Sequence, residues 1–135
     1  MPTLKQVLKV LASGPILAAA GMIAMATGAV DVDPTLGAIA RIYSDPLHLP
    51  LKPFLAFVGT TKLLSVLKLW GYNTMPSLKT AVLGLALPAT AAVYGHYKVE
   101  GPQAAAAPVI YLGILGYWSH LEFNVLFDEN PLKRD

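Results

Sequence analysis

Residues 78–99, LKTAVLGLALPATAAVYGHYKV, are the stretch that decides the fold of this chain. Apolar and small residues dominate the stretch, and its two lysines, Lys79 and Lys98, stand near its ends. A helix needs about 20 mostly apolar residues to cross roughly 30 Å of hydrocarbon. In lipid, a helix also pairs its own backbone groups, which an open sheet cannot do. The stretch therefore predicts a transmembrane helix.

Three further runs have the same character, namely residues 7–30, 51–72 and 106–127. Segments that contain proline, glycine or asparagine separate the runs, as is typical of turns. Only the first connection, residues 31–50, is long, and residues 36–43 within it predict a short interfacial helix. The sequence thus predicts an all-α fold, a four-helix transmembrane bundle that forms a single domain over residues 1–135.

The composition of the chain agrees with a location in lipid. Of the 135 residues, 55% are hydrophobic and only 13% are charged, whereas soluble domains carry about 25% charged residues. We therefore rank a soluble, very apolar helical bundle behind the membrane interpretation. The net charge of +2 is scattered, and nucleic-acid binding requires a clustered basic face. The absence of cysteine excludes disulfides, thiolate metal sites and a cysteine nucleophile.

The distribution of lysine and arginine predicts the orientation of the chain. One side of the predicted bundle carries Lys5, Lys9, Lys68, Lys79, Lys133 and Arg134, and the other carries Arg41, Lys52 and Lys98. The excess predicts that both termini lie on the cytoplasmic, matrix or stromal side. The first apolar run continues past a possible cleavage site to Val30, so we expect a retained helix and no cleaved presequence. A bacterial plasma membrane or an inner membrane of a mitochondrion or plastid fits this pattern.

Small residues predict which faces of the helices touch. Helices in lipid associate by close backbone approach, because lipid gives them no hydrophobic reason to meet. Such residues recur at helical spacing in the first, third and fourth runs, and Pro88 should also kink the third. The predicted packing positions are Gly14, Gly21, Gly84, Pro88, Gly95, Gly113 and Gly116.

Four polar side chains inside the predicted spans are candidate ligand contacts or polar tethers: Lys62, His96, His120 and Glu122. Lys62 is near the middle of its span, where a charge costs on the order of 3 kcal/mol. It either touches a ligand or serves as a structural tether. We expect Glu122 to be an interfacial carboxylate rather than a proton relay, and it lies on a face of the helix different from that of His120. Either histidine could ligate a pigment such as chlorophyll, but their opposite depths disfavour a bis-histidine haem.

The motifs that carry enzyme chemistry are missing from the sequence. There is no His-Glu-x-x-His motif, no carboxylate pair, no phosphate-binding glycine loop and no Ser/His/Asp set. We therefore expect neither a catalytic function nor a metal site.

Two stretches resemble the DoxX-like family of small four-helix membrane proteins. Residues 83–98, LGLALPATAAVYGHYK, are similar to that family's small-residue helix that ends in a histidine. Residues 57–67, FVGTTKLLSVL, are similar to its Gly-x-x-Lys second span. The resemblance implies a membrane subunit tied to quinone-linked redox enzymes or to assembly, with no common catalytic mechanism. It also implies that Lys62 and His96 form the best candidate site.

On these grounds we expect a non-catalytic accessory or assembly subunit of a larger membrane complex that converts energy, in respiration or photosynthesis. The alternative is a redox-linked membrane protein that binds a quinone, a lipid or a pigment. A transporter or channel ranks third, because the spans contain only one deep charge and no inverted repeat is evident. The expected partners are membrane lipids and other membrane subunits, and nucleic acid is not among them.

Overall fold

The computed structural model describes the backbone of residues 3–128 and the side chains of residues 3–123. Lys133 and Arg134, which contribute to the predicted orientation, lie outside these residues. All regular structure in the described part is helical. The elements are α1 (Leu4–Ala12), α2 (Pro15–Thr27), α3 (Pro34–Ser44), α4 (Leu51–Leu69), α5 (Leu78–Glu100), the 3-10 helix η1 (Pro102–Ala105) and α6 (Ala106–Asp128).

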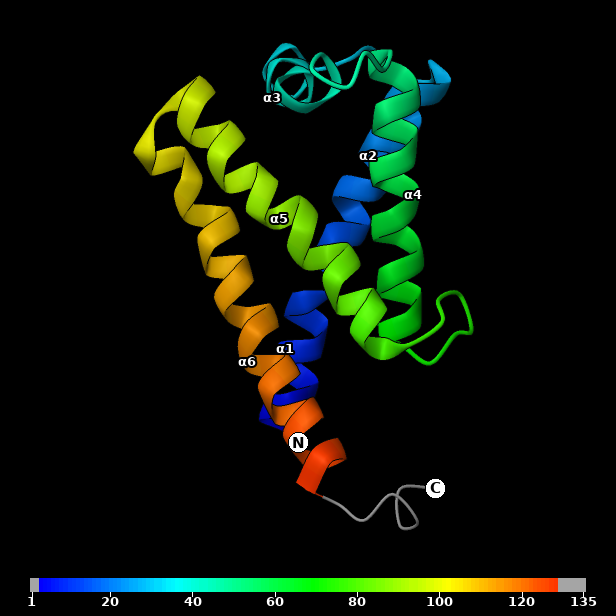
Figure 1. The fold of residues 1–135 in the computed structure, drawn as a ribbon, viewed down its shortest axis with the longest axis vertical. Coiled ribbons are helices and arrows are strands. Elements are labelled where there is room, and N and C mark those ends of the chain that lie inside the picture. Colours follow the sequence, from blue (N-terminus) through cyan, green and yellow to red (C-terminus); the bar gives the residue numbers. More distant parts are fainter. Residues whose placement is uncertain (1–2, 129–135) are drawn as a thin grey trace.

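Most of the helices run up and down along the long axis of the molecule, and α3 lies across one end (Figure 1). Helices α1 and α2 follow each other along that axis, and α4 packs beside α2 on the way back. Helix α5 crosses this pair at an angle, and α6 returns along α5 to pack against α1. The N-terminal residues and the end of α6 therefore lie at one end of the molecule, whereas α3 and the α5–α6 turn lie at the other.

The predicted first helix, residues 7–30, is two helices in the structure. Helix α1 ends at Ala12 and α2 begins at Pro15, and the first turn of a helix is where the proline ring costs no backbone hydrogen bond. The break is tied to α4: Ser13 Oγ donates to the Lys9 carbonyl at 2.8 Å, and the Trp70 indole N–H donates to Ser13 Oγ at 2.7 Å. Helix α2 then ends at Thr27, before Gly28, whose φ of 83° is left-handed.

Three stretches of the described chain are long and apolar enough to cross a membrane, namely Leu4–Thr27, Leu78–Glu100 and Pro102–Phe123. Helix α4 is not among them. It has 19 residues and contains three lysines, Lys52, Lys62 and Lys68. The all-helical, membrane-compatible part of the prediction is thus confirmed. The long first connection also contains a helix, α3, which extends beyond the predicted residues 36–43 at both ends.

Two separate apolar cores hold the helices together. The first joins α1, α4, α5 and α6 through Ala12, Val66, Leu69, Ala81, Leu85, Leu115 and Trp118. The second joins α2, α3 and α4 through Met22, Met25, Ala40 and Leu55. The helices are therefore packed around one core near α1 and another near α3.

Three glycines mark the closest helix contacts. A Cβ on Gly59 would lie 3.1 Å from Met22 Cβ and 3.2 Å from the Ala19 carbonyl oxygen of α2. A Cβ on Gly84 would overlap Ser65 Oγ of α4, and one on Gly95 would lie 2.5 Å from Ile39 Cγ2 of α3. The sequence predicts Gly84 and Gly95 as packing positions, whereas the contact at Gly59 is found only in the structure.

At three other predicted packing positions, the described chain shows no close helix contact. A Cβ on Gly21, Gly113 or Gly116 would meet no atom within 4 Å. Gly14 lies in the break between α1 and α2, and Pro88 lies inside α5, which continues through it. The small-residue stripe of α6 therefore faces outward, because α5 and α1 contact other faces of that helix.

A valine at Gly59 should push α4 away from α2, because its neighbours include backbone and a Cβ atom that cannot rotate aside. We expect Gly59→Val to lower the free energy of unfolding by about 1–3 kcal/mol. Detergent-induced unfolding in mixed micelles, followed by circular dichroism, measures the change. Gly113→Val is the matched control, with an expected change within about 0.5 kcal/mol. Equal losses in the two variants would contradict this account of the α2–α4 contact.

Candidate functional site

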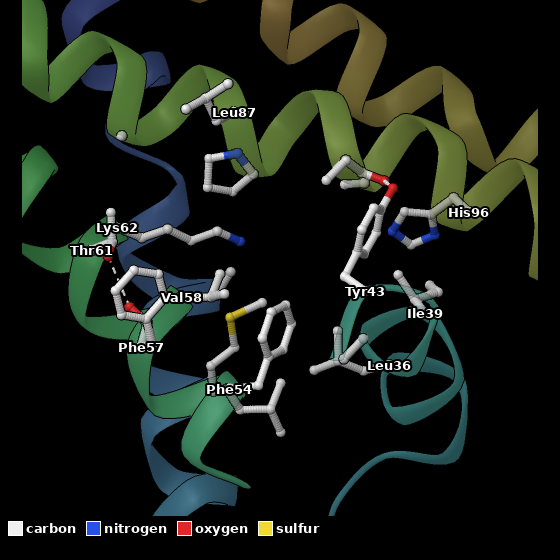
Figure 2. Close-up of a pocket in the computed structure, with 18 residues that line it drawn as sticks. Leu36, Ile39, Tyr43, Phe54, Phe57, Val58, Thr61, Lys62, Leu87 and His96 are labelled. Carbon is white, nitrogen blue, oxygen red and sulfur yellow. Dashed lines mark hydrogen bonds between the residues drawn. The ribbon is translucent and has the colours of Figure 1, made fainter. Parts of the chain in front are cut away.

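A cavity of about 510 Å³ lies between α2, α3, α4 and α5 (Figure 2). Its volume falls within the range of small-molecule sites, roughly 300–1,000 Å³. Most of its wall is apolar and includes Met22, Leu36, Ile39, Phe54, Val58 and Leu87. The polar side chains on the wall are those of Tyr43, Thr61, Lys62 and His96.

The helix packing explains why the cavity forms where it does. Helices α4 and α5 touch at Gly84, where the absence of a side chain admits Ser65. From that point α5 leans away from α4, so the two helices separate toward α3 (Figure 1). Helix α3 lies across the open end and contacts α5 where Ile39 meets Gly95. The cavity is the space left between the diverging helices and α3.

Lys62 extends from α4 into this space (Figure 2). The structure gives its ammonium no hydrogen bond and no ion pair with any residue of the described chain. Lys62 also lines a second cavity of about 240 Å³, together with Pro15, Leu85, Pro108 and Tyr111. Both cavities are lined by Ala18, Lys62 and Ala92. The lysine therefore stands where the two cavities meet.

The hydroxyl groups on the cavity wall already donate within the protein. Tyr43 Oη donates to the Ala91 carbonyl at 2.6 Å and so ties α3 to α5. Burial, together with the neighbouring Tyr94, raises the pKa of Tyr43 above its ordinary value, which favours the protonated, donating form. Thr61 Oγ1 donates to the Phe57 carbonyl of its own helix at 2.9 Å. An occupant of the cavity would meet these oxygens as acceptors.

His96 lies across the cavity from Lys62, close to Tyr43 (Figure 2). Its Nδ1 is 2.8 Å from Glu100 Oε1, one turn further along α5. An ionised carboxylate can only accept, so this contact places a proton on Nδ1. In the neutral imidazole the other nitrogen, Nε2, is then a hydrogen-bond acceptor. The two ends of the cavity thus differ, with an ammonium donor on α4 and an imidazole on α5.

The other two predicted site residues, His120 and Glu122, lie outside the cavity. Glu122 pairs with Lys5, which joins the last helix to the first. His120 is exposed on α6 and is not part of the cavity wall. The structure therefore brings Lys62 and His96 to one cavity and leaves His120 and Glu122 outside it. Nowhere between residues 3 and 123 do three or more His, Asp or Glu side chains gather in a way that could hold a metal ion.

The wall that α3 contributes to the cavity could not be predicted from the sequence. Leu36, Ile39 and Tyr43 lie in residues 36–43, which the sequence predicts only as a short interfacial helix. Nothing local to these residues indicates that α3 folds back over α4 and α5.

No known protein family, curated protein or solved structure matches the chain. The resemblance to the DoxX-like family therefore stays a prediction.

The hydrogen bond between Tyr43 and Ala91 should hold α3 over the cavity. We expect Tyr43→Phe to cost about 1 kcal/mol, the usual net value of one hydrogen bond, and to speed amide exchange in α3. Hydrogen–deuterium exchange in detergent, resolved by peptide, measures the effect. Tyr97→Phe is the control, because Tyr97 is exposed on the same helix as Ala91. Unchanged exchange in α3 of the Tyr43→Phe protein would show that the bond does not hold the helix.

Proposed function

We propose that this chain is an integral membrane protein that holds a small lipophilic molecule in the cavity between α2, α3, α4 and α5. The observation that carries the proposal is the cavity itself, which is apolar over most of its wall and has one ammonium extending into it. Apolar walls with a few polar groups are typical of small-molecule sites. No catalytic role is part of the proposal.

The outer surface of the bundle supports a location in lipid. Large apolar side chains are exposed on several helices, including Leu17 at 79%, Phe57 at 71% and Leu87 at 66%. Soluble monomers rarely expose contiguous apolar surface on this scale. In α4, Lys52 and Lys68 lie near the ends and Lys62 points into the cavity. Charges placed in this way avoid the surrounding hydrocarbon. We therefore propose that α4 also crosses the membrane, in addition to the three stretches named above.

The lipophilic nature of the occupant follows from where the cavity opens. Phe57 and Leu87 line the cavity and are also strongly exposed on the outside of the bundle. Both lie well inside their helices, α4 and α5. In a membrane, this opening would face the hydrocarbon and not water. A molecule dissolved in the bilayer could then reach the cavity sideways, and quinones and lipids belong to that class.

A second candidate function is the accessory subunit of a larger energy-converting complex. The observation that favours it is the outward stripe of α6, where Gly113 and Gly116 have open space in front of them. Small residues at such spacing permit a helix of another subunit to approach closely. The two functions are compatible, since a subunit of a quinone-linked complex could also hold the lipophilic molecule.

Cysteine accessibility tests the proposed topology, because the chain has no native cysteine. Single cysteines would replace Asp45, Asn73 and Gln103, which are exposed in three successive connections. With four spans, an impermeant maleimide should label the Asp45 and Gln103 variants from the same side, and Asn73 from the other. Both termini would then share the side of Asn73, the cytoplasmic, matrix or stromal side. If Asp45 and Asn73 share a side, α4 does not cross the membrane.

Mass spectrometry of an organic extract from the protein, purified from native membranes, tests for the bound molecule. Ala18→Phe should fill the cavity and lower the content of that molecule by about tenfold, which corresponds to 1.4 kcal/mol of binding. Ala20→Phe is the matched control, because Ala20 is exposed on the same helix and outside the cavity wall. A wild-type protein that carries no such molecule but co-purifies with other subunits would favour the accessory function instead.

A further inference from the structure

We propose that the molecule held in the cavity is a single-chain amphiphile with an anionic head group, and that the Lys62 ammonium binds this head. The inference rests on the proposed function and adds the chemical class of the ligand. It follows from the charges on the cavity wall, from the neighbourhood of Lys62 and from the volume available.

The charges on the wall favour an anion. Lys62 is the only lysine or arginine on the described wall, and no aspartate or glutamate lies there. Glu100, which is close by on α5, contacts His96 and is not part of the wall. An ammonium in a low-dielectric wall is costly unless an opposite charge or several acceptors compensate it. An anionic head group in the cavity would supply that charge, and a neutral molecule would not.

The neighbourhood of Lys62 leaves room for a head group. The ammonium extends into the larger cavity, and the side chain also borders the smaller one. The head group therefore meets the lysine where the two cavities adjoin, with the smaller space of about 240 Å³ available to it or to water. Charge-assisted hydrogen bonds from an ammonium to carboxylate or phosphate oxygens are roughly twice as strong as neutral ones.

The rest of the cavity suits one hydrocarbon chain. From Lys62 the wall continues over Val58 and Phe54 of α4 toward Leu36 and Ile39 of α3 (Figure 2). These side chains offer dispersion contacts and no hydrogen-bond donors. A volume of about 510 Å³ is in the lower half of the range for small-molecule sites, roughly 300–1,000 Å³. This volume fits a single chain better than a two-chain phospholipid.

Three probes with the same chain test the inference: hexadecanoate, hexadecyl phosphate and hexadecan-1-ol. Binding of each to the full-length protein is measured in nanodiscs of phosphatidylcholine. We expect at least one anion to bind the wild-type protein about tenfold or more tighter than the alcohol does. Preference for the carboxylate alone indicates a free fatty acid, and preference for the phosphate alone indicates a phosphate-headed lipid. Preference for both the carboxylate and the phosphate indicates a site that recognises negative charge without distinguishing the two head groups.

Variants of Lys62 assign the preference to its ammonium. Lys62→Met should remove the preference for the anions and leave the affinity for hexadecan-1-ol within about twofold, and Lys62→Arg should retain the preference. Lys52→Met is the matched control, because it removes the same charge from an exposed position on the same helix. If Lys62→Met does not fold, the wild-type ratio of anion to alcohol affinity still tests the inference.

Three results would overturn the inference, and they differ in what they leave standing. If the alcohol binds the wild-type protein as tightly as the anions do, the head group is not anionic. If Lys62→Met keeps the preference for the anions, Lys62 does not bind the head group. The cavity then remains a lipophilic site, as proposed above. If none of the three probes binds, the single-chain anionic occupant is wrong, and the mass spectrometry of the organic extract then decides separately whether the cavity holds another lipophilic molecule.

Discussion

The close approach of α4 to its two neighbours is the constraint on which the rest of the structure depends. Gly59 lets α4 meet the backbone of α2, and Gly84 lets Ser65 of α4 meet α5. With α4 fixed at both points, α5 must cross at an angle, and the two helices separate beyond Gly84. Helix α3 then covers the gap and is fastened to α5 by the Tyr43–Ala91 hydrogen bond. The cavity results from this sequence of contacts, since no single helix encloses it.

The helices could be predicted from the sequence because their signals are local. Apolar runs and the prolines and glycines between them place α4 and α5 at their observed first residues, Leu51 and Leu78. The division of the first run was missed, although Pro15 is a helix-start residue. A long apolar run with a proline near its beginning predicts one continuous helix. Here, the hydrogen bond from Trp70, 57 residues away, ties the break to α4.

The candidate site could be predicted only in part, because contacts between helices depend on residues far apart in the sequence. A lysine in the middle of an apolar run marks Lys62 without any structure, and the helix-ending histidine marks His96. That the two share one cavity depends on the crossing of α5 and on the position of α3. Glycine stripes were ambiguous for the same reason. Gly84 and Gly113 look alike in sequence, yet one lies at a tight contact and the other faces outward.

The pairing of the first helix with the last has a consequence for how the protein is made. Helix α1 contacts α6 through the Lys5–Glu122 ion pair and through Tyr111, whose hydroxyl donates to the Ala12 carbonyl at 2.7 Å. These partners are about a hundred residues apart, so α1 lacks them until α6 has been synthesised. Helix α2, by contrast, meets α4 within the first half of the chain. The break at Ser13–Gly14 thus separates α2, whose partner α4 is complete at Leu69, from α1, whose ion pair and hydrogen bond with α6 form only after that helix has been made.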